Sequence, residues 1–239
     1  MLKEDLCAYK YKYDLHVHTA PASPCAQVSV EDTLGAYARL GYSGVVITNH
    51  FNLDVFEPFE NAEAALDAYF GDYRRALEIS KELGMSVILG AELRFPENWN
   101  DYLLYGVTEN MLREMYGSLK DGYEAFYKKY KSDKTLFIQA HPFCDRMVLQ
   151  APALLDGAEV FNMHPGHNSR VGKAAQWAEE NPHFVITGGT DFHHPNHEGM
   201  CAVCTKEKIS DSFALSDILK SGDYIFDIWG EKIVPRKSN

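Results

Sequence analysis

The chain has 239 residues, of which 46% are hydrophobic, and it carries a formal net charge of −11 at pH 7. The length and composition are sufficient for one sizeable core, so we predict a single domain over residues 1–239. The acidic balance argues against a long nucleic-acid surface and an anionic membrane surface as partners, because both require a basic footprint.

The N-terminal segment carries acidic residues where a signal peptide would need a basic start and an apolar stretch. The sequence also lacks an apolar run of about 18 residues, the length that a membrane span needs. We therefore expect a cytoplasmic protein with no membrane partner.

Taken in order, the chain alternates short apolar runs with longer amphipathic ones. The apolar runs predict strands at 13–19, 44–48, 86–90, 102–107, 135–139, 158–162, 184–187, 202–205 and 224–228. The amphipathic stretches predict helices at 29–40, 61–83, 109–130, 169–180 and 211–220. Ser29 is typical of a helix N-cap, and Gly41 and Gly84 are typical residues just beyond a helix. Such alternation predicts an α/β fold, and we favour a barrel of parallel strands over an open sheet.

The first strand carries Asp14, His16 and His18 at every second position, so a regular strand would place the three side chains on one face. Two imidazoles beside a carboxylate suit a divalent transition metal, with the histidines as ligands and Asp14 orienting a ring nitrogen. The alternative is a pair of polar strand residues without a metal.

The same kind of residue recurs where later apolar runs end. The residues at or just past the ends of these runs are His16, His18, His50, Glu92, His141, Asp191 and His193. Parallel α/β folds gather their catalytic groups at the C-terminal ends of the strands. A cluster of imidazoles and carboxylates can hold two or three divalent ions, and a carboxylate such as Glu92 can bridge a pair of them.

Five segments, in this order, resemble the successive motifs of the PHP (polymerase and histidinol phosphatase) domain family. They are Asp14-x-His16-x-His18, Thr48-Asn49-His50, Gly90-Ala91-Glu92, Ala140-His141-Pro142 and Gly189-Thr190-Asp191-Phe192-His193. The resemblance implies a distorted (β/α)7 barrel with the metal site at the C-terminal ends of the strands. It also implies a metal-dependent phosphoesterase with two or three ions of zinc, manganese or iron. One ion would be held by His16, His18, Glu92 and Asp191, a second by Glu92 and His141, and a third by His50 and His193.

Three positions depart from the family pattern. Asn49 replaces the usual Asp before the second-motif His, which removes a charge but keeps the ligand. Cys25 stands where many members have His or Asp, and it is either a ligand of the third ion or an ordinary loop thiol. Asp101 stands where many relatives begin a strand with a ligand His, and it is either an oxygen ligand of the second ion or a residue that simply starts the strand.

Divalent ions polarise a phosphoryl group and lower the pKa of bound water from about 15.7 toward 7. We therefore predict a metal-dependent phosphoric-ester hydrolase, a phosphatase whose partner is a small phosphorylated metabolite. His193 or His194 could protonate the leaving alcohol. A guanidinium could grip the phosphate, and the candidates are Arg94, Arg146 and Arg170, each of which could instead be a surface residue. His164 is either a further ligand or a residue of the rim.

Two other functions fit the same sequence. One is an exonuclease or phosphodiesterase acting on short nucleic acid, against which the acidic charge counts. The other is a non-catalytic, metal-binding regulatory module, since a fold can keep part of a site without its activity.

Overall fold

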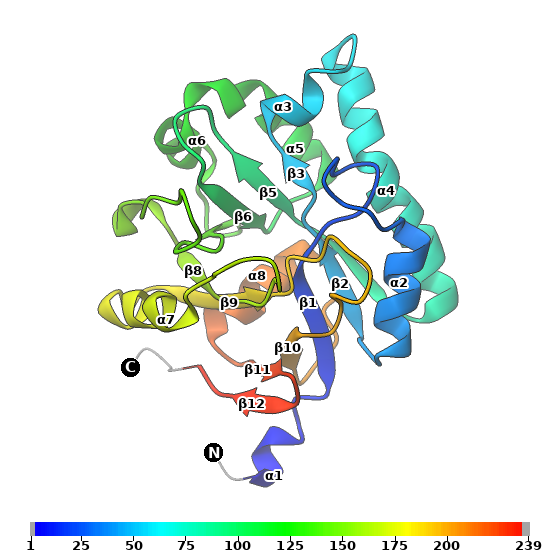
Figure 1. Ribbon diagram of the computed structural model, residues 1–239, viewed down its shortest axis with the longest axis vertical. Coiled ribbons are helices and arrows are strands. Elements are labelled where there is room, and N and C mark those ends of the chain that lie inside the picture. Colours follow the sequence, from blue (N-terminus) through cyan, green and yellow to red (C-terminus); the bar gives the residue numbers. More distant parts are fainter. Residues whose placement is uncertain (1–2, 236–239) are drawn as a thin grey trace.

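Strands and helices alternate along the part of the chain that the computed structural model describes, residues 3–235 (Figure 1). The first two and last four residues of the predicted domain lie outside these described residues. The strands are β1 (Tyr11–Val17), β2 (Gly44–Ile47), β3 (His50–Phe51), β4 (Ser86–Leu89), β5 (Ala91–Arg94), β6 (Asp101–Tyr105), β7 (Leu136–Gln139), β8 (Gly157–Asn162), β9 (Val185–Gly189), β10 (Cys201–Thr205), β11 (Ile225–Ile228) and β12 (Glu231–Ile233). The α-helices are α1 (Lys3–Leu6), α2 (Val30–Arg39), α3 (Leu53–Phe56), α4 (Ala62–Leu83), α5 (Glu109–Met115), α6 (Tyr123–Tyr130), α7 (Val171–Glu180) and α8 (Ser212–Ser221). The predicted α/β class is confirmed.

The strands form two sheets, in the orders β12-β11-β10-β1-β2-β4 and β3-β5-β6-β7-β8-β9. The prediction of parallel strands alone is wrong, because β1 pairs with β10 antiparallel and β6 pairs antiparallel with both β5 and β7. The connection between β5 and β6 is too short for the crossover that parallel neighbours require, so this pair forms a hairpin. The closed (β/α)7 barrel is not confirmed, since the hydrogen bonds of residues 3–235 divide the strands between two sheets.

The two sheets are joined at two places. On one side β4 continues into β5 through Gly90 alone. On the other side Val17 at the end of β1 pairs with Phe192, just past β9. Gly189 allows this approach, because a Cβ atom there would lie 2.4 Å from the Cβ of His16. The ends of strands from both sheets therefore meet in one place.

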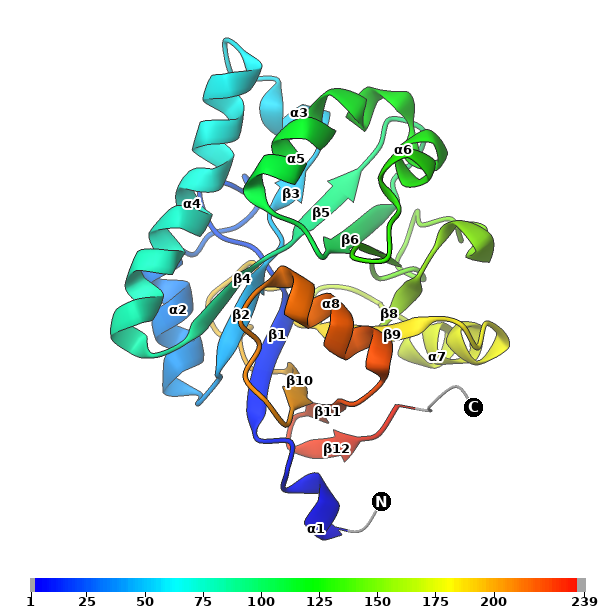
Figure 2. The same ribbon diagram turned by 180° about the vertical axis from the view of Figure 1, so that it is seen from behind.

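Alternate residues of a strand serve different parts of the core. In β6, Tyr102 and Leu104 pack outward with residues of α5 and α6, whereas Leu103 and Tyr105 pack inward with β1 residues and with Leu215 of α8. Helices α2 and α4 lie side by side, with α2 against β2 and α4 against β4 (Figures 1 and 2). Among the helices described between residues 3 and 235, none has both the length and the hydrophobicity that crossing a membrane requires.

The predicted elements need two corrections. The helix expected over 109–130 is divided, because a 3₁₀ helix (Tyr116–Asp121) follows α5 and Gly122, with φ of 83°, precedes α6. The strands β3, β5 and β12 were not predicted. With two and three residues, β3 and β12 are too short for a readable periodicity, and β5 follows β4 directly after Gly90. The capping predictions hold: Ser29 accepts a hydrogen bond from the backbone of α2, and α4 ends at Gly84 in the left-handed region.

Candidate metal centre

The structure brings the predicted ligands to one buried place where strands of both sheets end. His16 belongs to β1 and His18 follows it, His50 begins β3, and Glu92 lies in β5. The remaining residues of the cluster begin β6 or follow β7 and β9, and they are Asp101, His141, Asp191 and His193. Most of these side chains are almost completely buried.

The first group of ligand atoms lies around His16 and His18. Their Nε2 atoms are 3.0 Å apart, and Oδ1 of Asp191 is 3.4 Å from each. Oε1 of Glu92 is 3.2 Å from His16 Nε2, while its Oε2 is 3.3 Å from His18 Nε2. Four side chains thus direct nitrogen and oxygen atoms at one point, as a metal ligand set does.

The opposite ring nitrogens of the two histidines are held by hydrogen bonds. His16 Nδ1 lies 2.9 Å from Oε1 of Glu159, and His18 Nδ1 lies 3.0 Å from Oγ of Ser23. Such contacts orient an imidazole and leave Nε2 for the ion. Asn49 supports this arrangement, because its Oδ1 accepts a hydrogen bond from the Ser23 hydroxyl.

The expected role of Asp14 is wrong, and Glu159 takes that role instead. The carboxylate of Asp14 accepts hydrogen bonds from the backbone N–H groups of His16 and Thr190 and from the hydroxyl of Tyr37. The pairing of β1 with β2 shifts register between Asp14 and Val17, which breaks the regular alternation behind the prediction. Sequence reasoning missed Glu159, although an acidic residue inside an apolar strand was a usable signal.

A second group surrounds His141. Its Nε2 is 3.2 Å from Oε1 of Glu92, 3.8 Å from Oδ2 of Asp101 and 4.0 Å from Oδ2 of Asp191. His141 and Asp191 both have positive φ, at 29° and 53°. Strained conformations of non-glycine residues cluster at functional sites.

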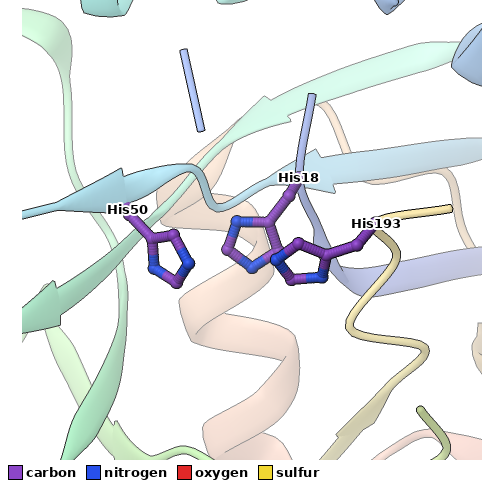
Figure 3. Close-up of side chains that lie close together, drawn as sticks. All are labelled: His18, His50 and His193. Atoms are coloured by element: carbon purple, nitrogen blue, oxygen red, sulfur yellow. The ribbon is translucent and has the colours of Figure 1, made fainter. Parts of the chain in front are cut away.

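A third group consists of His18, His50 and His193, whose rings come from three separate segments and face one another (Figure 3). Nδ1 of His193 donates a hydrogen bond to the backbone oxygen of Asp191 over 2.8 Å. The lone pair of its Nε2 is therefore available to a metal ion. The ring centroids of His50 and His193 lie 4.5 Å and 4.2 Å from that of His18. The side chains of the three groups therefore form one continuous centre joined through His18 and Glu92.

The donor set fits divalent metal ions. His50 Nδ1 and Glu92 Oε2 are 2.8 Å apart, yet both are buried and neither makes a hydrogen bond of acceptable geometry. Two ligand atoms that both point at one metal position lie close together in this way without a hydrogen bond between them. Imidazole nitrogens mixed with carboxylate oxygens suit zinc, manganese and iron.

Charges within the cluster shift its pKa values strongly. Burial opposes ionisation of Glu92, but His16 and His50 outweigh it and hold the pKa of that carboxyl well below its usual range. Burial likewise opposes protonation of His141, yet its contact with Glu92 and the charge of Asp191 raise its pKa to about 10. Burial and the nearby His18 lower the pKa of His193 to about 3. Without an ion, protonated imidazoles balance the carboxylates, and a bound ion would replace those protons.

The cluster opens into a cleft of about 740 Å³, which is the size of a small-molecule site. Cys25, His164 and His194 line this cleft, as does His167, which was not predicted. Nδ1 of His167 is 3.4 Å from Oδ2 of Asp191. Cys25 lies outside the ligand groups found among residues 3–235. Its side chain is exposed to solvent, yet its thiol lies among neighbouring atoms of the cleft wall, and this partial burial together with the charge of Glu92 raises its pKa to about 11.

The three candidate arginines differ in position. Arg94 lines the cleft, whereas Arg146 and Arg170 do not. Arg146 lies over the ring of Trp99, and Arg170 binds the carboxylate of Asp145 and a backbone oxygen. Arg94 is therefore better placed than Arg146 or Arg170 to bind a phosphate at the metal cluster.

The model of the PHP domain family matches residues 14–178. The chain belongs to this family. The matched span covers most of the predicted motifs, and the structure assembles their residues into one centre.

Several solved structures share the fold of this PHP domain at low sequence identity. A two-domain protein from Bacteroides vulgatus, described as containing a predicted PHP-like metal-dependent phosphoesterase, is 16% identical with a TM-score of 0.65, over 90% of this chain and 64% of the other. A lesion-specific endonuclease from Pyrococcus furiosus is 14% identical with a TM-score of 0.59, over 88% of this chain and 56% of the other. An amidohydrolase from Chromobacterium violaceum, solved with bound sulfate and no metal, is 13% identical with a TM-score of 0.53, over 87% of this chain and 96% of the other. The chain thus spans less than two thirds of the two-domain protein and of the endonuclease. No curated protein matches it.

Proposed function

We propose that this PHP domain hydrolyses a phosphomonoester of a small metabolite. The observation that carries the proposal is the continuous set of imidazoles and carboxylates, joined through His18 and Glu92, at the base of a cleft of about 740 Å³. A cleft of this size accommodates a small molecule and leaves little room for a folded macromolecule.

The residues of the chain have three roles in this proposal: they hold the ions, orient the ligands and protonate the leaving group. His16, His18, Asp191 and Glu92 would hold one ion, Glu92 and His141 a second, and His50 and His193 a third. When bound, zinc, manganese or iron would polarise the phosphoryl group and lower the pKa of water. Glu159 and Ser23 orient the two imidazoles of the first motif. His194 lines the cleft and lies outside the ligand groups found among residues 3–235, and we assign to it the protonation of the leaving alcohol.

We also propose that the two sheets act together as one distorted barrel in a single cytoplasmic domain. The inward side chains of both sheets, such as Leu15 of β1 and Ile138 of β7, share one core cluster, which supports this arrangement. The close approach of Gly189 to His16 supports it as well.

Short nucleic acid is the second candidate substrate, because Trp99 at the surface lies beside both Arg94 and Arg146. An aromatic ring with basic neighbours suits single-stranded nucleic acid. The net charge of −11 counts against it.

The test combines metal analysis with a substrate screen. We expect at least about two divalent ions per chain, and turnover of phosphomonoesters that exceeds turnover of bis(p-nitrophenyl) phosphate and of short single-stranded DNA. His16→Ala and Asp191→Ala should each lower turnover at least about a hundredfold in a folded protein, whereas the exposed His183→Ala should not. Faster cleavage of DNA would favour the second candidate. Bound metal without turnover of any ester would indicate a regulatory module.

A further inference from the structure

Asp101 is a buried carboxylate with both oxygens already bound. Nε of Arg94 donates to its Oδ1 over 2.8 Å, and Nη2 of Arg94 donates to its Oδ2 over 2.6 Å. Asp101 is only 2% exposed, so solvent screens these contacts little. This bidentate geometry is the strongest form of a carboxylate–guanidinium pair.

Asp101 also lies within reach of the metal cluster, grouped with His50 and Glu92 by distance. Distance alone would therefore allow the ligand role that the family's usual His suggests. An ion at Asp101 would have to share this buried carboxylate with the guanidinium, and the two positive charges would repel each other. His141 is accordingly closer to Glu92, at 3.2 Å, than to Asp101, at 3.8 Å.

The same pair fixes Arg94 at the wall of the cleft. The ring of Trp99 lies 5.6 Å from the guanidinium carbon and packs against the group that Asp101 holds. Within residues 3–235, Nη1 of Arg94 makes no hydrogen bond or ion pair, and the side chain lines the cleft. A guanidinium held in this way presents its remaining N–H groups to whatever the cleft contains.

We propose that Asp101 is a positioning residue for Arg94 and not a metal ligand, and that Arg94 binds a non-reacting phosphoryl oxygen of the substrate. The inference rests on the proposed phosphoester substrate. A planar guanidinium with fixed donors matches the oxygens of a phosphate group. The Asp at this position, where many family members have His, would then remove a nitrogen ligand of the metal. It would provide instead a carboxylate that holds the guanidinium of Arg94.

Two variants test the roles of this pair. In Asp101→Asn, we expect the metal content of the wild type and at least about tenfold weaker binding of inorganic phosphate, measured by calorimetry on the metal-loaded protein. In Arg94→Lys, we expect the same metal content and a similar loss, because an ammonium cannot make the bidentate contact. The double variant should bind phosphate no more weakly than Arg94→Lys, since Asp101 acts through Arg94.

The direction of the change in phosphate affinity in Asp101→Asn separates two explanations. Removal of a negative charge near the cleft would by itself strengthen the binding of an anion, so a loss of affinity requires the positioning role. The matched controls are Asp67→Asn and Arg113→Lys, a surface ion pair away from the cleft, which should change neither quantity. Thermal unfolding checks that each variant is folded. If Asp101→Asn does not fold, the phosphate affinity of Arg94→Lys alone tests the proposal.

Loss of about one ion per chain in Asp101→Asn would overturn the inference, and so would unchanged phosphate affinity in Arg94→Lys. Neither readout needs turnover. A protein that binds phosphate through Arg94 but hydrolyses no ester would contradict the proposed function and leave this assignment of Arg94 and Asp101 standing.

Discussion

At the scale of single residues, the centre depends on side chains that hold the ligands as well as on the ligands themselves. Glu159 contacts the ring of His16 and also accepts a hydrogen bond from the backbone of His141. One buried carboxylate thus links residues of two ligand groups. Its geometry indicates a positioning role for the metal centre.

We expect Glu159→Leu to weaken metal binding about 10- to 100-fold, because His16 loses the group that sets its tautomer and orientation. Glu159→Gln should have a smaller effect, since an amide oxygen can still accept from Nδ1. Metal affinity measured by competition with a chromogenic chelator checks this order. Equal affinities in the wild type and both variants would show that Glu159 does not support the site.

Metal binding should release protons at neutral pH. The contact with Glu92 and the charge of Asp191 raise the pKa of His141 to about 10, so the metal-free imidazole is protonated at pH 7. That proton stabilises the metal-free fold fully below the ordinary histidine pKa of about 6.5, and the stabilisation is lost as the pH rises through about 10. An ion needs the neutral imidazole, so apparent metal affinity should rise with pH until the pH reaches about 10.

Calorimetry in two buffers with different ionisation enthalpies measures the released protons. We expect a binding enthalpy that depends on the buffer and corresponds to at least about one proton per chain at pH 7. Identical enthalpies in both buffers would contradict the protonated state of the metal-free cluster.

At the scale of elements, the approach of β9 to β1 decides whether the ligands meet. A methyl group at Gly189 would lie 2.4 Å from the Cβ of His16 and 2.8 Å from its backbone nitrogen. Since both contacts involve atoms near the backbone, a rotamer change cannot relieve them. The strands would have to separate.

We expect Gly189→Ala to destabilise the fold by about 1–3 kcal/mol and to lower metal affinity, because it moves His16 away from Asp191. The matched control is Gly71→Ala in α4, where an added Cβ has no neighbour within 4 Å. That substitution should stabilise the protein by about 0.5–1 kcal/mol. Urea unfolding measures both, and a neutral Gly189→Ala would mean that β1 and β9 can part without cost.

At the scale of the whole molecule, the centre ties the two sheets together. His16 belongs to the sheet of β1, whereas Glu92 lies in β5 and His141 follows β7, both of which are strands of the other sheet. An ion held between them would bind the folded chain and not the unfolded one. Metal binding should therefore stabilise the fold by mass action.

We expect a chelator to lower Tm and added zinc or manganese to restore it. At a free metal concentration about 100 times Kd, the gain should be about 2.7 kcal/mol. His16→Ala should largely lose this response, while the exposed His183→Ala should keep it. A Tm that does not change with metal would show that the ions do not link the sheets.

The sequence by itself determined the α/β class and the identity of the clustered residues. An apolar run followed by His, Glu or Asp is a local pattern, and β-strands that end in one place carry such residues together, as His50, Glu92 and His141 do. The order of the motifs was also enough to indicate the PHP family, which the match over residues 14–178 shows.

Only the tertiary structure decided how those residues are held. The contacts of Glu159 with His16 and of Arg94 with Asp101 join strands whose pairing no local pattern specifies, and Asp14 turns to backbone groups because β1 shifts register against β2. The division into two sheets has the same origin. Pairing depends on which distant segments bury each other's apolar faces, and that is settled when the whole chain packs.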